Sequence, residues 1–260
     1  MPQHINDVLQ LLLRWAHVIA GIIWIGHLYF FNWVNAHFVK VLDGPTKKMI
    51  IPELAPRALF WFRWGAAWTW ITGILLGGLV DYHGRVVFED PNDQSNNPWL
   101  WLAIILAILI VGFLIYNIVM KKVANVVVAN VIVLVLLAAV YLFLEQVGRF
   151  GGRSLYIHTG MILGTMMAMN VWMIIWPYQK RIIAATKEGT APNPTEVAQA
   201  GLRSRHNTYM SVPLVFTMIS NHYPTVYGSE YRNLYLVGVF ILGFAAVRWM
   251  YGKSGKVAGM

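Results

Sequence analysis

The sequence predicts an all-α fold, a polytopic membrane helical bundle with about seven transmembrane helices. Hydrophobic residues make up 58% of the 260 residues and charged residues only 12%, about half the charged fraction of an ordinary soluble domain. Several stretches also reach the ~20 apolar residues that a helix needs to cross about 30 Å of hydrocarbon. There is no internal repeat and no shift in composition, so we expect a single integral-membrane domain over residues 1–260.

Seven hydrophobic segments carry this prediction: Val8–Val34, Leu59–Val80, Leu100–Met120, Val123–Leu144, Leu155–Pro177, Tyr209–Asn221 and Leu234–Tyr251. The first is longer than a span requires, which predicts a tilted or projecting helix. The sixth is short, so its helix should extend back towards His206, and Pro213 should kink it. The connections Asn35–Ala58 and Tyr178–Arg205 contain several prolines and predict mainly irregular structure.

The distribution of basic residues predicts the orientation of the chain. One set of alternate connections, with the C-terminal tail, is rich in basic residues: Lys40, Lys47, Lys48, Arg57, Lys121, Lys122, Lys180, Arg181, Lys187, Arg203, Arg205, Lys253 and Lys256. The other set carries only Arg85, Arg149, Arg153 and Arg232. Because cytoplasmic loops are enriched in Lys and Arg, we expect the N-terminus outside and the C-terminus in the cytoplasm. No basic stretch precedes the first segment, which predicts a retained helix and not a cleavable signal.

Net charge and cysteine content exclude several classes of function. The net charge of +9 follows the positive-inside bias, and no basic run is interleaved with exposed aromatic residues as nucleic-acid surfaces require. We therefore expect lipid and no nucleic acid as a partner. The chain has no cysteine, which excludes disulfides, iron–sulfur clusters and covalently attached c-type haem. Any haem must be held by non-covalent ligation.

Histidines are the most informative side chains. His17, His27, His158 and His222 lie within or at the ends of hydrophobic segments, and His206 opens another. An ionisable side chain in hydrocarbon is costly, so it indicates a functional site. Imidazoles on several helices favour ligation of a haem or metal between them. The alternative is that each histidine only hydrogen-bonds a neighbouring helix.

The predicted orientation places these histidines at two depths. His17, His158 and His222 fall near the outer face and are the candidate ligands of a haem iron, whereas His27 and His206 fall near the inner face. Arg14 precedes His17 by three residues and therefore shares its face. It is a candidate partner for a haem propionate, unless it only snorkels to the surface.

Other polar residues on the last three helices suggest a binding site. The segment from Arg203 to Tyr209 (Arg-Ser-Arg-His-Asn-Thr-Tyr) opens the sixth helix. Charge-assisted bonds there would suit a planar, carbonyl-rich anion. The candidate ligands of such an anion are Arg203, Arg205, Asn207, Tyr209 and Asn170. The segment is equally explained as a positive flank with a helix cap. Gly160 and Gly164 form a small-xxx-small pair, which is more typical of close helix packing than of a cofactor surface.

Most of the chain resembles one family. The first helix, from Arg14 to Gly26, and the tryptophan-rich second helix, from Trp61 to Trp70, are similar to those of the bacterial membrane-bound urate oxidase (urate hydroxylase) N-terminal domain family. The C-terminal half resembles it more specifically, in Tyr156–Thr165, Asn170, Pro177, Arg203–Asn207, Tyr209, Pro213 and Met218–Pro224.

The resemblance implies a bacterial inner-membrane oxidoreductase. It would oxidise urate to 5-hydroxyisourate and pass electrons to cytochrome c, in purine catabolism. Members typically carry a C-terminal cytochrome c domain that this chain lacks, so we expect a separate c-type cytochrome or partner redox subunit. One or two b-type haems would lie between the helices.

Two other functions remain open at the level of sequence. One is a haem-b electron-transfer subunit of a larger respiratory complex, without urate activity. A transporter or structural subunit would use the histidines only for hydrogen bonds, but only one span is interrupted by a proline, whereas transporters typically have paired broken helices.

Overall fold

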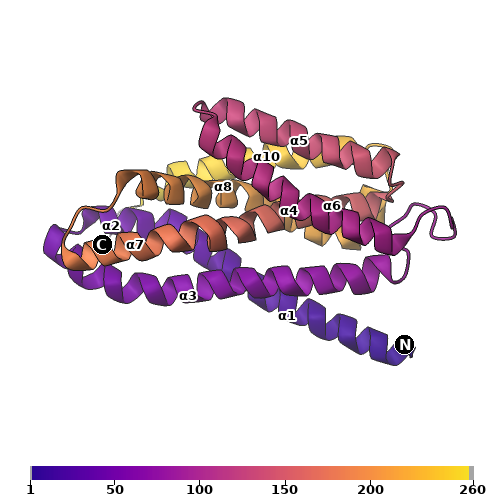
Figure 1. The fold of residues 1–260 in the computed structure, drawn as a ribbon, viewed down its shortest axis with the longest axis horizontal. Coiled ribbons are helices and arrows are strands. Elements are labelled where there is room, and N and C mark those ends of the chain that lie inside the picture. Colours follow the sequence, from indigo (N-terminus) through magenta and orange to yellow (C-terminus); the bar gives the residue numbers. More distant parts are fainter. Residues whose placement is uncertain (1, 258–260) are drawn as a thin grey trace. The chain divides into compact units, whose positions relative to one another are not determined.

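The computed structural model describes residues 2–257, and within them the chain is helical with no strand, only an isolated antiparallel bridge between Phe88 and Phe150. The all-α prediction is therefore confirmed. Figure 1 follows the chain through its elements. In order they are α1 (Gln3–Tyr29), η1 (Phe30–Asn35), α2 (Ala36–Val41), α3 (Gly44–Leu76), η2 (Gly77–Tyr82), α4 (Pro98–Lys122), α5 (Val126–Gln146), α6 (Gly152–Met169), η3 (Asn170–Ile175), α7 (Trp176–Glu188), α8 (Pro194–Ile219), η4 (Ser220–His222), α9 (Pro224–Tyr227) and α10 (Arg232–Ser254).

Five helical segments of the described residues are long and apolar enough to cross a membrane: Gln3–Val41, Pro98–Lys122, Val126–Gln146, Gly152–Glu188 and Arg232–Ser254. They contain the first, third, fifth and seventh predicted spans and most of the fourth. The second predicted span lies in α3 and η2 and the sixth in α8 and η4, which are helical but not among these five. The finding supports a membrane protein, while seven spans and the orientation stay predictions.

The prediction of irregular connections was wrong. Residues 36–41 form α2, and α3 already begins at Gly44 with Pro45 in its first turn, where a missing N–H costs no hydrogen bond. Pro52 and Pro56 lie inside α3 without ending it. Between α7 and α8 only a short turn remains, at Gly189, whose φ of +79° suits glycine.

An asparagine caps the N-terminus of each helix in the α4–α5 hairpin. The side-chain oxygen of Asn97 accepts from the N–H groups of Trp99 and Leu100, at 3.0 and 3.3 Å. Asn125 does the same for the first turn of α5. These bonds satisfy N–H groups that have no partner within the helix, and they explain why α5 begins at Val126 and not at Val123.

The chain divides into two compact units, each built from separate stretches of sequence. Unit 1 contains the described residues up to Arg14, then Gly73–Met166 and Pro213–Val239. Unit 2 contains Trp15–Thr72, Met167–Val212 and the described residues from Phe240 onwards. Each unit has its own buried side chains.

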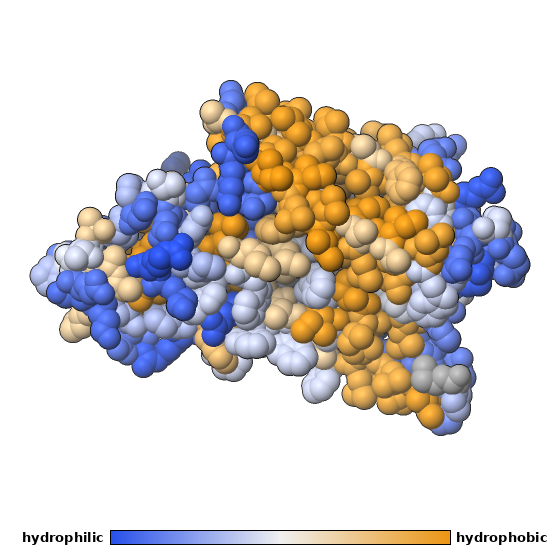
Figure 2. Space-filling view, viewed as in Figure 1, coloured by the Kyte–Doolittle hydropathy of each residue, from blue (hydrophilic) through white to orange (hydrophobic). Residues whose placement is uncertain are grey.

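Unit 1 combines an aromatic core with a wide apolar surface. Phe88, Trp101 and Phe150 pack edge to face, with ring centroids 5.4 to 5.9 Å apart. On the outside, only 6% of the most apolar stretch of α5 is buried, and Figure 2 shows the hydrophobic side chains gathered over the α4–α5 hairpin. An exposed apolar surface of this kind suits lipid or a membrane partner.

The loop between η2 and α4 is more ordered than a solvated turn. The Arg85 guanidinium donates to the carbonyl oxygens of Pro91, Asp93 and Asn96, at 3.0, 2.5 and 3.0 Å. Hydrogen bonds from Ser95, through its hydroxyl and its backbone N–H, lower the pKa of the Asp93 carboxyl. The Arg85 guanidinium therefore holds three carbonyl groups of the loop by hydrogen bonds.

The contact between α6 and α8 in unit 1 depends on Gly160. A Cβ atom at this position would lie 2.4 Å from both Thr217 Oγ1 and Met218 Cε, closer than any real contact. At Gly164 the nearest atom, a methyl carbon of Leu214, would be 3.5 Å away, an ordinary van der Waals distance. The predicted close packing is therefore confirmed at Gly160.

Unit 2 has a similar close approach between α1 and α3. A Cβ atom at Gly65 would lie 3.0 Å from the backbone nitrogen of Trp24 and 3.2 Å from the carbonyl oxygen of Ala20. Trp24 is only 2% exposed and Phe62 1%. The backbones of the two helices meet at the glycine while large side chains fill the space on either side.

The two glycines of α6 allow a matched test. Gly160→Ala should lower the stability of the protein by about 1–3 kcal/mol, because overpacking a close contact forces the neighbours apart. Gly164→Ala should be neutral or slightly stabilising, since alanine favours the helix. Thermal unfolding in detergent measures both variants. Equal stability of the two would contradict the assigned α6–α8 contact.

Candidate functional site

His158 lies at the centre of a buried polar cluster in unit 1. It is fully buried on α6, and the residues around it come from three elements that are distant in sequence. We call this group the His158 cluster; its members are Asp81, Tyr82, Arg153, Ser154, His158 and Asn221. Except for Arg153 and Asn221, each member is at most 3% exposed.

Both ring nitrogens of His158 are hydrogen-bonded. Nδ1 lies 2.7 Å from the carbonyl oxygen of Ser154, which can only accept, so Nδ1 carries the proton. In a neutral ring Nε2 is then the acceptor, and it lies 2.8 Å from the Tyr82 hydroxyl. Burial, followed by the neighbouring Asp81 carboxylate, raises the pKa of Tyr82, so the phenol stays protonated and donates to His158.

Asp81 forms an ion pair with Arg153 in the same cluster. The guanidinium Nη1 is 2.5 Å from the Asp81 carboxylate, whose side chain is 5% exposed. Through Nε the same guanidinium also donates to the side-chain oxygen of Asn221. A buried carboxylate needs such compensation. The pair and its bond to Asn221 therefore connect η2, α6 and η4 within unit 1.

The two remaining candidates of unit 1 are accessible. His222 follows Asn221 in the short helix η4, and its side chain is exposed. Arg14 is exposed on α1 and donates to Gln10, one turn earlier, at 3.4 Å. Neither side chain belongs to the buried part of the His158 cluster.

In unit 2, His17 is held by Thr72 of α3. His17 Nδ1 lies 3.0 Å from Thr72 Oγ1. The hydroxyl of Thr72 gives its own hydrogen to the carbonyl oxygen of Trp68, at 2.6 Å. The threonine oxygen therefore accepts from His17, whose Nδ1 carries the proton. Again Nε2 is the nitrogen with a free electron pair.

The inner pair of candidates, His27 and His206, also belongs to unit 2. His27 Nδ1 donates to the carbonyl oxygen of Ile23, one turn earlier on α1, at 2.7 Å. Its Nε2 is consequently the unprotonated nitrogen. His206 is half-buried on α8.

The hydrogen bonds of these histidines are compatible with haem ligation. Nowhere in residues 2–257 do three or more histidine, aspartate or glutamate side chains form a group that could hold a metal ion. Haem iron needs only one or two side-chain ligands. A ligating imidazole usually donates its other N–H to a backbone carbonyl or similar acceptor, as His17, His27 and His158 do. For His158, ligation would require Nε2 to exchange the Tyr82 hydroxyl for iron.

The face of α1 around His17 has two further properties of a cofactor surface. Gly21, one turn after His17, has no side chain, and a Cβ there would meet nothing closer than 4.0 Å. Trp24, on the next turn of the same face, buries an indole N–H for which the described residues offer no acceptor. A buried donor without an acceptor costs free energy, and a bound group with oxygen atoms would supply one.

Two of the predicted anion-binding residues bind each other. Asn170 and Asn207 are both fully buried in unit 2. Asn170 Nδ2 donates to Asn207 Oδ1, and Asn207 Nδ2 donates to the Met167 carbonyl oxygen, both at 2.9 Å. The structure brings them together as a hydrogen-bonded pair that joins α8 to the start of η3.

The other three anion-binding candidates differ in accessibility. Arg203 is fully buried, whereas Arg205 is exposed and its guanidinium lies 5.8 Å from the centroid of the Tyr251 ring. Tyr209 is half-buried and stacks on the same ring, with centroids 6.1 Å apart. Arg205 and Tyr209 are thus the two members that a ligand could reach.

A hydrogen-bond network that sequence analysis missed lies beside them in unit 2. Asn32 donates to Ser204 at 2.8 Å and accepts from the Tyr251 hydroxyl at 2.9 Å. Tyr29 and Ser211 form a second bond between α1 and α8, at 2.9 Å. The sequence could have indicated this network through Asn32, because an amide side chain within a hydrophobic segment needs a hydrogen-bond partner.

The π-helices mark these polar positions. Asn32 lies in η1, Asp81 and Tyr82 end η2, and Asn170 begins η3. A π-helical turn alters the register of the backbone hydrogen bonds and is frequent at functional sites. Asp81 and Tyr82 lie just beyond the second predicted span, and the sequence alone gave them no role. The position of the acidic Asp81 at the end of a span was the one feature of the sequence that could have indicated a functional role.

The ion pair of the His158 cluster can be tested by removing one charge. Asp81→Asn should lower stability by about 3 kcal/mol, because Arg153 then loses its charged partner in a mostly buried position. Adding Arg153→Gln to Asp81→Asn should restore part of that loss. Thermal unfolding of the single and double variants measures the coupling. Additive effects of the two substitutions would show that the pair contributes little.

Comparison with known proteins gives one match. The model of the family described as urate oxidase N-terminal matches residues 3–258, which is nearly the whole chain. No curated protein and no solved structure matches the sequence.

Proposed function

Because the chain belongs to the urate oxidase N-terminal family, we propose that it is a membrane-bound oxidoreductase that oxidises urate to 5-hydroxyisourate. The reaction adds one water to urate and releases two electrons and two protons. The electrons would go to a c-type cytochrome, on a separate protein or partner subunit. The family match over residues 3–258 is the observation that carries this proposal.

We further propose that histidines hold b-type haem. His17 in unit 2, or His158 or His222 in unit 1, would ligate an outer haem, and His27 with His206 would support a second. The Nδ1 hydrogen bonds of His17, His27 and His158 favour this, because they leave Nε2 as the ligating nitrogen. A bound b-type haem would supply one-electron transfer, so the two electrons of urate would leave in separate steps.

The chain's own residues would bind and position the substrate. Urate is a planar monoanion at neutral pH, and the exposed Arg205 can donate two parallel hydrogen bonds to such a group. Tyr209, stacked on Tyr251, presents an aromatic neighbour to a planar ring. Arg203, Asn170 and Asn207 are fully buried, so we assign them to positioning α8 and not to direct contact with urate.

The haem proposal is tested by spectroscopy. The protein purified after haem-replete expression should show a Soret band and a reduced-minus-oxidised spectrum typical of haem b. His17→Ala, His158→Ala or His222→Ala should lower the haem content if that histidine is a ligand, whereas His83→Ala, in an exposed loop, should not. Absence of a Soret band in the wild type would defeat the proposal.

The substrate proposal is tested by kinetics. Arg205→Gln should raise KM for urate on the order of tenfold with a smaller effect on kcat, because a charge-assisted hydrogen bond is lost. Arg57→Gln serves as a control, since Arg57 pairs with Glu53 on the exposed part of α3. Turnover is followed as reduction of cytochrome c. A haem protein that urate does not reduce would favour the electron-transfer subunit instead.

A further inference from the structure

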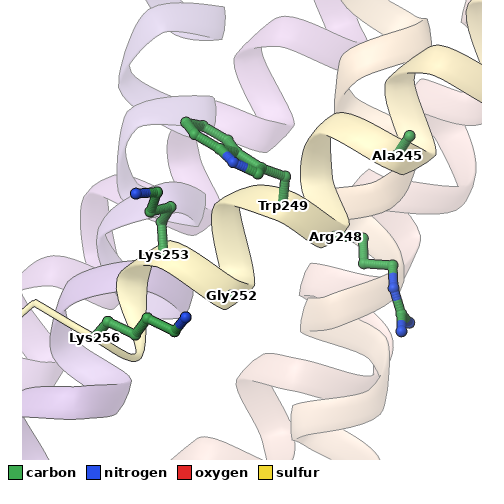
Figure 3. A pocket seen from close by; sticks show the side chains of 6 residues that line it. All are labelled: Ala245, Arg248, Trp249, Gly252, Lys253 and Lys256. Atoms are coloured by element: carbon green, nitrogen blue, oxygen red, sulfur yellow. The ribbon is translucent and has the colours of Figure 1, made fainter.

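The last turns of α10 form an open hollow in unit 2. Six residues line it, and its volume is about 450 Å³. Figure 3 labels these residues along the end of α10 and the turn that follows it; they are Ala245, Arg248, Trp249, Gly252, Lys253 and Lys256. Alanine and glycine leave room between the longer side chains.

The hollow carries uncompensated positive charge. Arg248, Lys253 and Lys256 are all exposed. The sequence contains no acidic residue from Arg232 to Val257. Within the described part of the chain none of these three cations belongs to an ion pair. Three cations on one exposed surface therefore favour an anionic ligand.

An apolar surface adjoins the charges on the same helix. Trp249 is 62% exposed, and its ring lies 5.9 Å from the ammonium group of Lys253. About two turns earlier, Leu242 and Ile241 are 71% and 64% exposed. Because Arg232–Ser254 is a candidate membrane span, this order of apolar, aromatic and basic residues matches a helix that reaches a membrane surface.

We propose that this hollow binds an anionic phospholipid. Its phosphate group would lie among Arg248, Lys253 and Lys256, and Trp249 would lie at the level of the headgroup. One acyl chain would follow the exposed apolar side chains of the preceding turns of α10. A free phosphate would share the charge contacts but would leave the aromatic and apolar part of the surface without a role. The combination of both surfaces therefore favours a lipid.

The proposal is tested by counting bound lipid. The delipidated full chain in a neutral detergent is titrated with phosphatidylglycerol or phosphatidylcholine, and native mass spectrometry measures the bound fraction. The wild type should bind phosphatidylglycerol more tightly. The triple variant Arg248→Gln, Lys253→Gln and Lys256→Gln should lower that affinity at least about tenfold, since each basic residue near an anionic surface contributes about fivefold.

A matched control variant distinguishes lipid binding at this hollow from attraction by the overall positive charge of the protein. Lys121→Gln, Lys122→Gln and Lys187→Gln also remove three exposed cations and should leave the affinity for phosphatidylglycerol unchanged. An equal loss in this control would overturn the proposal. If the triple variant does not fold, the double variant Lys253→Gln and Lys256→Gln, on the exposed final turn, replaces it and should still lose affinity.

Competition with a small anion separates lipid from free phosphate. Glycerol phosphate or inorganic phosphate is added at the concentration of phosphatidylglycerol that saturates the protein. At this concentration neither small anion should displace the bound lipid. Displacement would show that the hollow is a small-anion site and would overturn the proposal. Trp249→Ala should weaken lipid binding while leaving any binding of inorganic phosphate unchanged. None of these measurements uses urate or haem, so they do not depend on the proposed function.

Discussion

The N–H group of a histidine among apolar helices must find an acceptor, because an unpaired polar group out of water costs several kcal/mol. His158 and His27 each donate to the carbonyl oxygen four residues earlier on the same helix. His17 donates to the hydroxyl of Thr72 on α3, whose own hydrogen is already used. These hydrogen bonds decide the tautomer of each ring, and Nε2 is left for a ligand or, in His158, for Tyr82. The haem proposal depends on this constraint.

The same constraint explains how the other buried polar side chains are arranged. Asp81 is compensated by Arg153 in unit 1, and Asn170 by Asn207 in unit 2. Each pair joins segments that are distant in sequence, and each includes a residue of a π-helix. A changed register of backbone bonds and a paired polar side chain coincide at these positions. Functional sites in helical proteins are often built in this way.

Much of the candidate site could be predicted from the sequence, but not the partners of its residues. The sequence identified His158, Asn170 and Asn207 as candidates because each is a polar residue in or beside a hydrophobic segment. The roles of Asp81, Tyr82 and Asn32 were missed, because their partners lie far along the chain. Tyr82 and His158 are 76 residues apart, and Asn32 and Tyr251 are 219 apart. A single sequence carries no signal for such pairs. The prolines of α3 did not break the helix: Pro45 lies in the first turn, where a missing N–H is tolerated, and Pro52 and Pro56 lie inside the helix without ending it.

The sequence by itself determined the all-helical class, the apolar segments and the absence of cysteine, because these follow from local hydropathy and from composition. It also determined which polar side chains need a partner. Only the tertiary structure decided which partner each one has, which glycine allows two helices to meet, and which cations remain exposed. These outcomes depend on the rotation and crossing of helices, which are set by the packing of many side chains at once.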